Sequence, residues 1–324
     1  MFINYTKSLY SEEKVVAKDA LQPQMIHQIT DGGMAYKAGV KTMPGVLVDG
    51  LLGNSVVQTI KQLCPDEERN GLILAAGGTI WTGYITKETN VDITPRIKVM
   101  PISMNQIFAG KCANLLGKYE YVSTDSSSCV SGHAALHQAS MLLKADELDN
   151  VTIISVDNAT SQEYLNFFAQ QGLVKLLDKE EMKFNIGQGA NVTVVSNYNK
   201  SAIASLDGIG FASEKHNTPL GITETGDGYR KAIENAARTA TQEPDVIKTH
   251  ATFSIDNEIE EKIVKELYPS SRIVNYKLRI GHTMGASTAI EFDLALQELN
   301  PGEHLLSLGA GMGNVFTAAR ATKL

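Results

Sequence analysis

The stretch YEYVSTDSSSCVSGHAALHQASMLLKAD, residues 119 to 146, decides how this chain is interpreted. A β-rich run ends at Ser123, a cluster of small polar residues follows, and an apolar helical pattern starts near Cys129. Cys129 is therefore expected at a strand-to-helix turn, where free N–H groups and the helix dipole favour a thiolate and can hold an oxyanion. A small buried structural cysteine fits the same pattern, so this stretch alone leaves both roles open.

Two histidines occupy similar positions later in the chain. The segment VIKTHATFSIDNEIEE, residues 246 to 261, ends a predicted strand at His250 and then opens a helix. In NYKLRIGHTMGASTAIEFDLALQEL, residues 275 to 299, His282 follows Gly281 just before a long amphipathic helix. Strand ends and strand-to-helix turns are where α/β proteins place ligand and catalytic groups. Each histidine alone is more often structural, but together with Cys129 they fit one site assembled from distant segments.

The remaining cysteines and two further histidines have simpler interpretations. Cys64 and Cys112 lie within apolar helical patterns and are expected in the core. His133 and His137 stand one helical turn apart, a spacing that a metal pair can use. No third ligand follows at a recognisable spacing, so we favour helix packing for both histidines and expect no metal.

Strand-like and helical runs alternate along the chain, which predicts an α/β protein with mostly parallel sheets covered on both faces. A division near residues 180 to 190 gives halves 1–185 and 186–324, with no clear sequence repeat between them. The predicted strands are Gly45–Val48, Leu72–Ala76, Tyr119–Ser123, Val151–Asp157, Asn191–Ser196, Ala202–Phe211, Val246–Thr249, Ile273–Tyr276, His304–Leu308 and Val315–Arg320. The predicted helices are Asn54–Leu63, Met104–Leu116, Val130–Leu143, Ser161–Gln170, Gly228–Ala240, Asn257–Leu267 and Met284–Gln297.

Composition excludes several classes of protein. Apolar residues make up 43% of the 324 residues, enough for a sizeable core, and the formal net charge of -7 argues against a nucleic-acid partner. Three cysteines make a poor disulfide framework and fit a reducing compartment. The N-terminal sequence does not have the pattern of a signal peptide, and no apolar run reaches the ~20 residues of a membrane span. We therefore expect a soluble cytoplasmic protein.

Several ordered motifs, from about residue 100 to the end, resemble the β-ketoacyl-acyl-carrier-protein synthases of the thiolase superfamily. The serine-rich run into Cys129, with Ala139 downstream, resembles their nucleophile segment. THAT, residues 249 to 252, resembles their Asn-Ala-His-Gly-Thr motif. Glu258 and Glu261 follow at the spacing of the family's Asp and Glu.

Three further segments extend the resemblance. Residues 277 to 291 reproduce the Lys-x-x-x-Gly-His-(Ser/Thr)-x-Gly-Ala pattern, with its Glu nine residues after the His. SLGAGMGN, residues 307 to 314, resembles Ser-Phe-Gly-Phe-Gly-Gly-x-Asn. GIGFASEKHNTPL, residues 208 to 220, resembles the Gly-rich strand before the substrate-lining loops.

The resemblance implies a thiolase-like fold, in which two similar βαβαβ-type halves form a five-layered α-β-α-β-α sandwich. It implies acyl transfer to the cysteine, followed by decarboxylative condensation with a malonyl thioester. The implied residues are Cys129, His250 and His282 as catalytic groups, Lys277, Glu291 and Glu258 as supporting groups, the N–H groups of Cys129 and Ala310 as the oxyanion hole, and Thr252, Gly309, Gly311, Met312 and Asn314 as substrate-lining residues.

The resemblance also implies partners but no metal or organic cofactor. Substrates would be thioesters of acyl carrier protein or coenzyme A, in fatty acid or polyketide-type biosynthesis. A homodimer, or a heterodimer with a related subunit, would form through the edge strand Tyr119–Ser123. Candidates for a basic surface that docks the acidic carrier are Lys111, Lys118, Arg272 and Arg279, each of which also fits an ordinary surface charge.

This chain departs from the family pattern in five respects. It is shorter than typical members with two catalytic histidines, and its N-terminal third matches only faintly. Ser127-Ser128-Cys129 replaces Thr-Ala-Cys, Ala310 replaces the gating phenylalanine, and Met312 replaces a glycine. Two alternatives therefore stay open: an acyltransferase that does not decarboxylate, and a non-catalytic partner subunit similar to a chain-length factor.

Overall fold

The computed structural model describes residues 1–10, 26–28, 35–37, 48, 50–77, 105–157, 187–218, 221–240, 242–252 and 255–324. Its main feature is a 10-stranded sheet in the order β10-β9-β11-β12-β8-β1-β7-β6-β4-β5. The strands are β1 (Phe2–Tyr10), β4 (Asn70–Ala75), β5 (Tyr121–Asp125), β6 (Asn150–Asp157), β7 (Gly189–Ser196), β8 (Ala204–Ser213), β9 (Val246–Lys248), β10 (Arg272–Val274), β11 (His304–Gly311) and β12 (Val315–Lys323). Two short strands, β2 (Ile26–Gln28) and β3 (Ala35–Lys37), pair only with each other.

The helices connect these strands in a repeated pattern. The α-helices are α2 (Asn54–Leu63), α5 (Asn105–Leu116), α6 (Ser131–Lys144), α8 (Asp227–Ala237), α9 (Ile255–Leu267), α10 (Lys277–Ile280) and α11 (Ser287–Glu298). Two 3-10 turns, η1 (Ser128–Val130) and η2 (Met284–Ala286), directly precede α6 and α11.

The described elements form two topological repeats. The first repeat is β1, α2, β4, α5, β5, η1, α6, β6 and β7, and the second is β8, α8, β9, α9, β10, α10, η2, α11, β11 and β12. In each repeat the third strand lies at the edge, followed by the second, fourth, fifth and first strands, and β1 meets β8 where the repeats join. By topology β7 belongs to the first repeat, whereas the predicted division at 185/186 assigns it to the second half.

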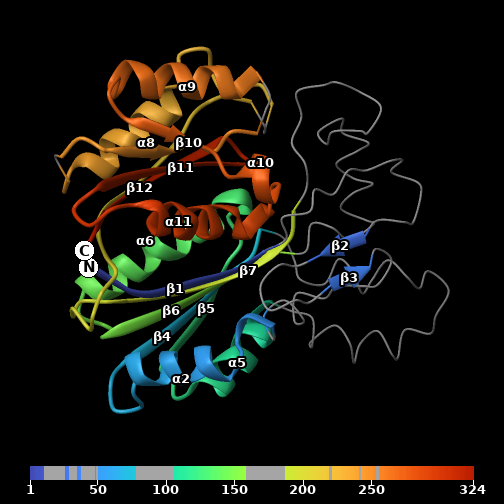
Figure 1. Ribbon diagram of the computed structural model, residues 1–324, viewed down its shortest axis with the longest axis vertical. Helices are drawn as coiled ribbons and strands as arrows, with labels where there is room; N and C mark the ends of the chain where they lie inside the picture. Colours follow the sequence, from blue (N-terminus) through green and yellow to red (C-terminus); the bar gives the residue numbers. More distant parts are fainter. Residues whose placement is uncertain are drawn as a thin grey trace.

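Figure 1 shows how the repeats are layered. Helices α6 and α11 lie side by side between the two parts of the sheet, α8 and α9 cover one outer face, and α2 and α5 cover the other. The two central helices approach closely at Gly132, where an added Cβ would lie 2.8 Å from both the backbone N and the Cβ of Ala289. The central position of α6 and α11 explains why both are buried along most of their length.

The bounds of most predicted helices and strands are confirmed within one to three residues. Two predictions are wrong, and a third lies outside the described residues. The sheet is mixed, because β1, β7, β8 and β12 pair antiparallel with their neighbours. Strand β1 was missed, and Val48, the one described residue of the predicted strand Gly45–Val48, is helical. The predicted helix Ser161–Gln170 lies outside the described residues.

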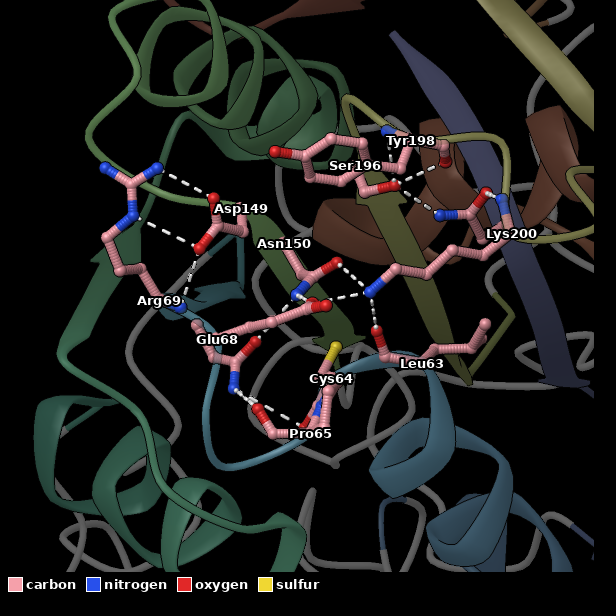
Figure 2. A network of polar contacts seen from close by, with 12 residues as sticks. Leu63, Cys64, Pro65, Glu68, Arg69, Asp149, Asn150, Ser196, Tyr198 and Lys200 are labelled. Carbon is pink, nitrogen blue, oxygen red and sulfur yellow. Dashed lines mark hydrogen bonds and ion pairs between the residues drawn. The ribbon is translucent and has the colours of Figure 1, made fainter.

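A polar network closes the end of the sheet at which β4 and β6 begin (Figure 2). Lys200 donates to the carboxylate of Glu68 at 2.5 Å, to the carbonyl of Leu63 at 2.9 Å and to the side chain of Asn150 at 3.2 Å. Arg69 binds Asp149 at 2.7 Å beside it. These contacts tie the connection after β7 to the starts of β4 and β6, so they stabilise the end of the first repeat opposite to Cys129.

No helix in the described part of the chain combines the length and hydrophobicity that are needed to cross a membrane.

Candidate active site

Cys129 lies in η1, at the carboxyl end of β5. The carboxylate of Asp125, the last residue of β5, accepts hydrogen bonds from the backbone N of Ser127 at 3.0 Å and from its hydroxyl at 3.1 Å. The next residue, Ser128, has a left-handed backbone with φ 57°. This kink turns the chain sharply from strand into helix α6, and it leaves Cys129 half-buried at the bend. The predicted strand-to-helix position of Cys129 is confirmed.

The ionisation of Cys129 differs from the sequence-based expectation. Burial raises the pKa of the thiol above its ordinary value, and a hydrogen bond from Ser128 and the charge of Lys277 act in the opposite direction. A carboxylate, Asp157, also raises the thiol pKa. Helix geometry alone suggested a depressed pKa, but burial is the larger effect here. The resting sulfur is therefore mainly a thiol, and its ionisation depends on nearby hydrogen bonds and charges.

The second turn, η2, carries the chain away from His282. Gly281, with φ 72°, allows the change of direction before His282, and Met284 has a left-handed φ of 46°. The backbone N of Met284 donates to Nδ1 of His282 at 2.9 Å. Nδ1 is therefore an acceptor, and the ring proton lies on Nε2, which is the donor of this imidazole.

The two turns contact each other directly. Asp157, at the end of β6, joins η2 to the end of β4, because one of its oxygens accepts from the backbone N of Gly77 at 3.1 Å and of Gly285 at 2.9 Å. An added Cβ at Gly285 would lie 1.8 Å from the backbone N of Gly77. The turn η2 and the end of β4 are thus held together by a close backbone contact that only glycine permits.

His250 packs against His282. The ring centroids are 5.4 Å apart with an interplanar angle of 85°, and both rings are almost completely buried. The carboxylate of Glu260 fixes the loop, accepting from the backbone N of His250 at 2.6 Å and of Ala251 at 2.9 Å. Glu258, predicted to support this histidine, is exposed to solvent instead.

A buried ionic cluster lies beneath the histidines. Glu291 binds Lys277 at 2.6 Å through one carboxylate oxygen and Lys248 at 2.9 Å through the other, and all three side chains are buried. Ser287 also donates to Glu291. Burial alone would raise the pKa of Glu291, but Lys248 and Lys277 lower it to about 2. The carboxylate therefore stays ionised.

Burial and these lysines keep both histidines neutral. Burial, with Lys277, lowers the pKa of His282 to about 3. The pKa of His250 also lies well below its usual value, for the same two reasons and because His282 is close. A neutral imidazole carries one ring N–H and can donate a hydrogen bond through it without being positively charged. The pair is therefore suited to stabilise negative charge on an oxygen.

The hairpin between β11 and β12 covers the Cys129 turn. An added Cβ at Gly309 or at Gly311 would lie 3.1 Å from the side chain of Val130. Between these glycines, Ala310 lies in β11 opposite Phe316. The backbone N of Met312 donates to the hydroxyl of Ser128 at 3.3 Å. The predicted loop and the predicted nucleophile are therefore neighbours.

Asn314 and Thr252, which are both predicted to line the substrate site, differ in their surroundings. The side chain of Asn314 donates to the carbonyls of Thr218 at 3.0 Å and Gly221 at 2.6 Å, so it holds the neighbouring loop. Thr252 is half-buried, two residues after His250. The roles of both residues in substrate binding stay predictions.

The remaining predicted residues separate into packing and surface positions. His133 contacts Thr317 at 2.8 Å and Ser307 at 3.2 Å, and the ring of His137 lies 5.1 Å from Phe211, so the two histidines pack in different surroundings. No cluster of metal-binding side chains occurs in the described residues. The four candidate docking cations are spread over the molecule: Lys111 and Lys118 lie in and after α5, and Arg272 and Arg279 lie in β10 and α10 (Figure 1).

Sequence reasoning missed four residues of this region. Lys248 had a usable signal, since a lysine inside the apolar strand VIK needs a buried partner. Glu260 was passed over in favour of its neighbours Glu258 and Glu261. Asp157 and Ser128 gave no signal, because their contacts with Gly285 and Met312 join segments far apart in the sequence.

Solved structures of ketosynthases have the same arrangement of strands and helices. AntDE:AntF, a type II polyketide synthase acyl-carrier protein in complex with its ketosynthase bound to the hexaketide, matches with a TM-score of 0.69 and 18% identity, over 80% of this chain and 79% of that chain. The complex of the ketosynthase ApeO with its chain length factor ApeC from Xenorhabdus doucetiae gives a TM-score of 0.69 and 15% identity, over 100% and 98%. This chain has the ketosynthase fold. Ketosynthase twelve of the bacillaene polyketide synthase from Bacillus amyloliquefaciens agrees, with a TM-score of 0.63 and 14% identity over 80% and 56%.

Sequence comparison gives a more distant relationship. The chain is 27% identical over 255 residues to the erythronolide synthase EryA3 of Saccharopolyspora erythraea, which covers 68% of this chain and 8% of that synthase. No family model matches. The ketosynthase and chain-length-factor fold is therefore accompanied by distant sequence similarity to a polyketide synthase, of which this chain spans only a small part.

Proposed function

We propose that this protein is a β-ketoacyl-synthase-like condensing enzyme that works in fatty acid or polyketide-type biosynthesis. The observation that carries the proposal is the contact between η1, which holds the half-buried Cys129, and η2, which follows His282, a neutral histidine whose ring proton lies on Nε2. His250, packed against His282, supplies a second neutral ring. A nucleophile on one turn, with one neutral histidine at the adjoining turn and a second packed against it, suits acyl transfer followed by stabilisation of an enolate.

In the first step Cys129 receives an acyl group. Its sulfur attacks the carbonyl of an acyl thioester, the C–S bond to the carrier breaks, and the carrier leaves as a thiol with the proton of Cys129. The N–H groups of Cys129 and Ala310 hold the oxyanion of the tetrahedral intermediate. The closeness of the Gly309–Gly311 segment to η1 supports this assignment.

In the second step a malonyl thioester loses carbon dioxide. The electron pair of the broken C–C bond forms an enolate, whose oxygen accepts hydrogen bonds from His250 and His282. The enolate carbon attacks the acyl-Cys129 carbonyl, and the sulfur of Cys129 leaves as a β-ketoacyl thioester forms. Each donor is expected to contribute roughly 10²–10³ in rate, as oxyanion donors do in other enzymes.

The finer architecture follows the same proposal. The chain would form a five-layered sandwich of a Cys-bearing half and a His-bearing half, with the boundary moved from 185/186 to the connection between β7 and β8. Substrates would be carrier-protein or coenzyme A thioesters. The edge strand β5 would pair with a second copy or with a related subunit, and the complex of ApeO with its chain length factor supports an assembly of two related chains.

Intact-mass measurement tests the nucleophile. Incubation with acyl carrier proteins, or coenzyme A, loaded with different acyl groups is expected to give an acyl adduct that Cys129→Ala abolishes. Cys112→Ala, which changes a buried cysteine elsewhere, should keep the adduct. Addition of malonyl carrier should then yield a β-keto product, and His250→Ala or His282→Ala should slow the release of carbon dioxide. Unchanged release in both histidine variants would refute their assigned role.

Chain-length-factor complexes among the structural matches support a second candidate, a partner subunit that shapes the pocket of another ketosynthase. The raised thiol pKa of Cys129 also fits a chain that is not itself acylated. The same experiment separates the three readings. No adduct supports the partner subunit, an adduct without a β-keto product supports an acyltransferase, and both together support the condensing enzyme.

A further inference from the structure

The turn around Cys129 contains a second polar side chain that touches the sulfur. The hydroxyl of Ser128 donates to Sγ of Cys129, with an O–S distance of 3.6 Å. The same oxygen accepts from the backbone N of Met312 at 3.3 Å. One hydroxyl thus connects the nucleophile of the first repeat with the hairpin of the second.

These two contacts fix the direction of the hydroxyl. A serine hydroxyl has one proton to donate and two lone pairs to accept with. Since Met312 N–H occupies a lone pair, the proton is free to point toward the sulfur. Serine at this position also differs from the alanine of the motif Thr-Ala-Cys that the segment resembles, so the contact is a property of this chain.

A donor at this place changes the balance that sets the ionisation of the thiol. Burial disfavours the thiolate, because the charged form loses its hydration. A hydrogen bond to the charged form favours it, and such bonds are stronger when the acceptor is ionised. The adjacent hydroxyl of Ser127 has no such role, since its partner is Asp125 at 3.1 Å.

We propose that Ser128 is a catalytic residue whose hydroxyl, oriented by Met312 N–H, stabilises the thiolate of Cys129. The proposal deepens the proposed condensing function, because it names the group that stabilises the reactive form of the half-buried nucleophile. On acylation the sulfur loses its negative charge, so this hydrogen bond weakens. Its stabilisation therefore applies to the free thiolate, before attack and after release of product.

Alkylation kinetics test the proposal directly. The rate of reaction of Cys129 with iodoacetamide, followed by intact mass and peptide mapping from about pH 6 to about pH 11, reports the fraction of thiolate. Ser128→Ala should raise the apparent pKa of the thiol by about one unit, which makes alkylation about tenfold slower at neutral pH. The rates should converge at high pH. Cys64 and Cys112 are buried and should react far more slowly.

Two matched variants control the test. Ser127→Ala removes the neighbouring hydroxyl and should leave the profile unchanged. Ser128→Gly removes the hydroxyl and also relieves the left-handed backbone at φ 57°, so it should shift the profile as Ser128→Ala does, and it carries the test if the alanine variant folds poorly. Thermal unfolding verifies that each variant is folded.

An alkylation profile of Ser128→Gly or of folded Ser128→Ala that superimposes on that of the unaltered protein would overturn the proposal. Equal shifts in Ser127→Ala and Ser128→Ala would overturn it as well, because the effect would not belong to the contact with sulfur. Iodoacetamide needs no acyl donor. If the proposed function were wrong and the role of Ser128 right, acyl donors would give no adduct on Cys129. Ser128→Ala would still shift the pH profile of alkylation.

Discussion

The turns η1 and η2 occupy equivalent places in the two repeats but are built for different tasks. Both follow the third strand of a repeat, both begin with a left-handed residue, and both lead into a central helix. In the first repeat only Ser126 and Ser127 separate strand from turn, and the middle residue of the turn is Cys129. In the second, residues 275 to 283 intervene and the middle residue is Gly285. The longer connection brings Lys277 and His282 into the site.

The duplicated topology thus offers two positions for a nucleophile, but packing permits a side chain at only one of them. Gly285 lies against the backbone of Gly77, so a side chain there has no space. The helices that follow the two turns also differ, in the polarity of one buried position. Four residues into α6 stands the apolar Ala135, and four residues into α11 stands Glu291 with its two lysines. The first repeat supplies the sulfur, and the second supplies the charge environment.

Loss of the charge beneath the second turn should have the largest effect. Glu291→Gln would leave the ammonium groups of Lys248 and Lys277 buried without an anion, so we expect a loss of about 3–5 kcal/mol in the free energy of unfolding. Urea unfolding at neutral pH measures it. Glu266→Gln, which breaks the exposed pair with Arg230, should have a far smaller effect, because solvent screens that pair. Equal stabilities of the two variants would show that Glu291 is not the counter-ion of this cluster.

Filling the second turn should come next. Gly285→Ala would force a Cβ to within 1.8 Å of the backbone N of Gly77, which must move away. Overpacking of this kind costs about 1–3 kcal/mol, and urea unfolding measures the loss. Gly110→Ala is the matched control, because an added Cβ there meets nothing within 4 Å. If Gly285→Ala were as stable as the control, close packing would not explain why the second turn lacks a side chain.

The pH dependence of stability sharpens the comparison between the repeats. The pKa of His282 is lowered from 6.5 to about 3. Below about pH 6.5 the imidazole of His282 is therefore protonated in the unfolded chain but remains neutral in the folded protein. Stability is therefore fully present above that pH and falls as the pH decreases toward 3. Between about pH 7 and about pH 5 this site alone should cost about 2 kcal/mol.

His282→Asn removes this titration, and its side-chain oxygen can still accept from Met284 N–H. The variant should lose less stability than the unaltered protein between these two pH values, as measured by urea unfolding at each. Glu291, with a pKa of about 2, does not interfere, because its contribution is lost only below about pH 4.5. Parallel pH profiles would contradict a neutral, buried His282.

The smallest effect is expected at the far end of the first repeat. Lys200 binds a carboxylate and a backbone carbonyl (Figure 2), as Lys248 does with Glu291 and Leu308. The partners of Lys200, however, are partly exposed. Lys200→Met should cost about 1 kcal/mol or less and lose part of its effect at high salt. Thermal unfolding at low and high salt measures it. A loss as large as that of Glu291→Gln would remove the contrast between the two ends of the molecule.

The sequence predicted the bounds of individual helices and strands better than it predicted which distant segments contact each other. Helix α2 was placed at its observed bounds, because its apolar positions follow a clear helical period. Strand β1 was missed because its buried side chains include Asn4 and Ser8, whose partners Ser196 and Asp293 lie far away in the sequence. Parallel and antiparallel strands buried on both faces look alike in sequence, so the mixed sheet was not foreseen.

The candidate site shows the same limit. Motifs located Cys129, His250 and His282, since each stands at a boundary between elements. They did not locate Lys248 or Ser128, whose meaning depends on Glu291 and Met312. The burial that raises the thiol pKa likewise comes from segments that no local pattern reveals.

Strand β1 has a consequence for how the protein is made. It is translated long before its neighbours, since Phe2 pairs with Ser196 and Ser205. At ribosomal speeds of about 5–20 residues per second, roughly 10–40 seconds pass before these partners emerge. During that interval both long edges of β1 are open to other chains, and contacts so distant in sequence form slowly. The strand that joins the two repeats is therefore also the segment that most needs protection during synthesis.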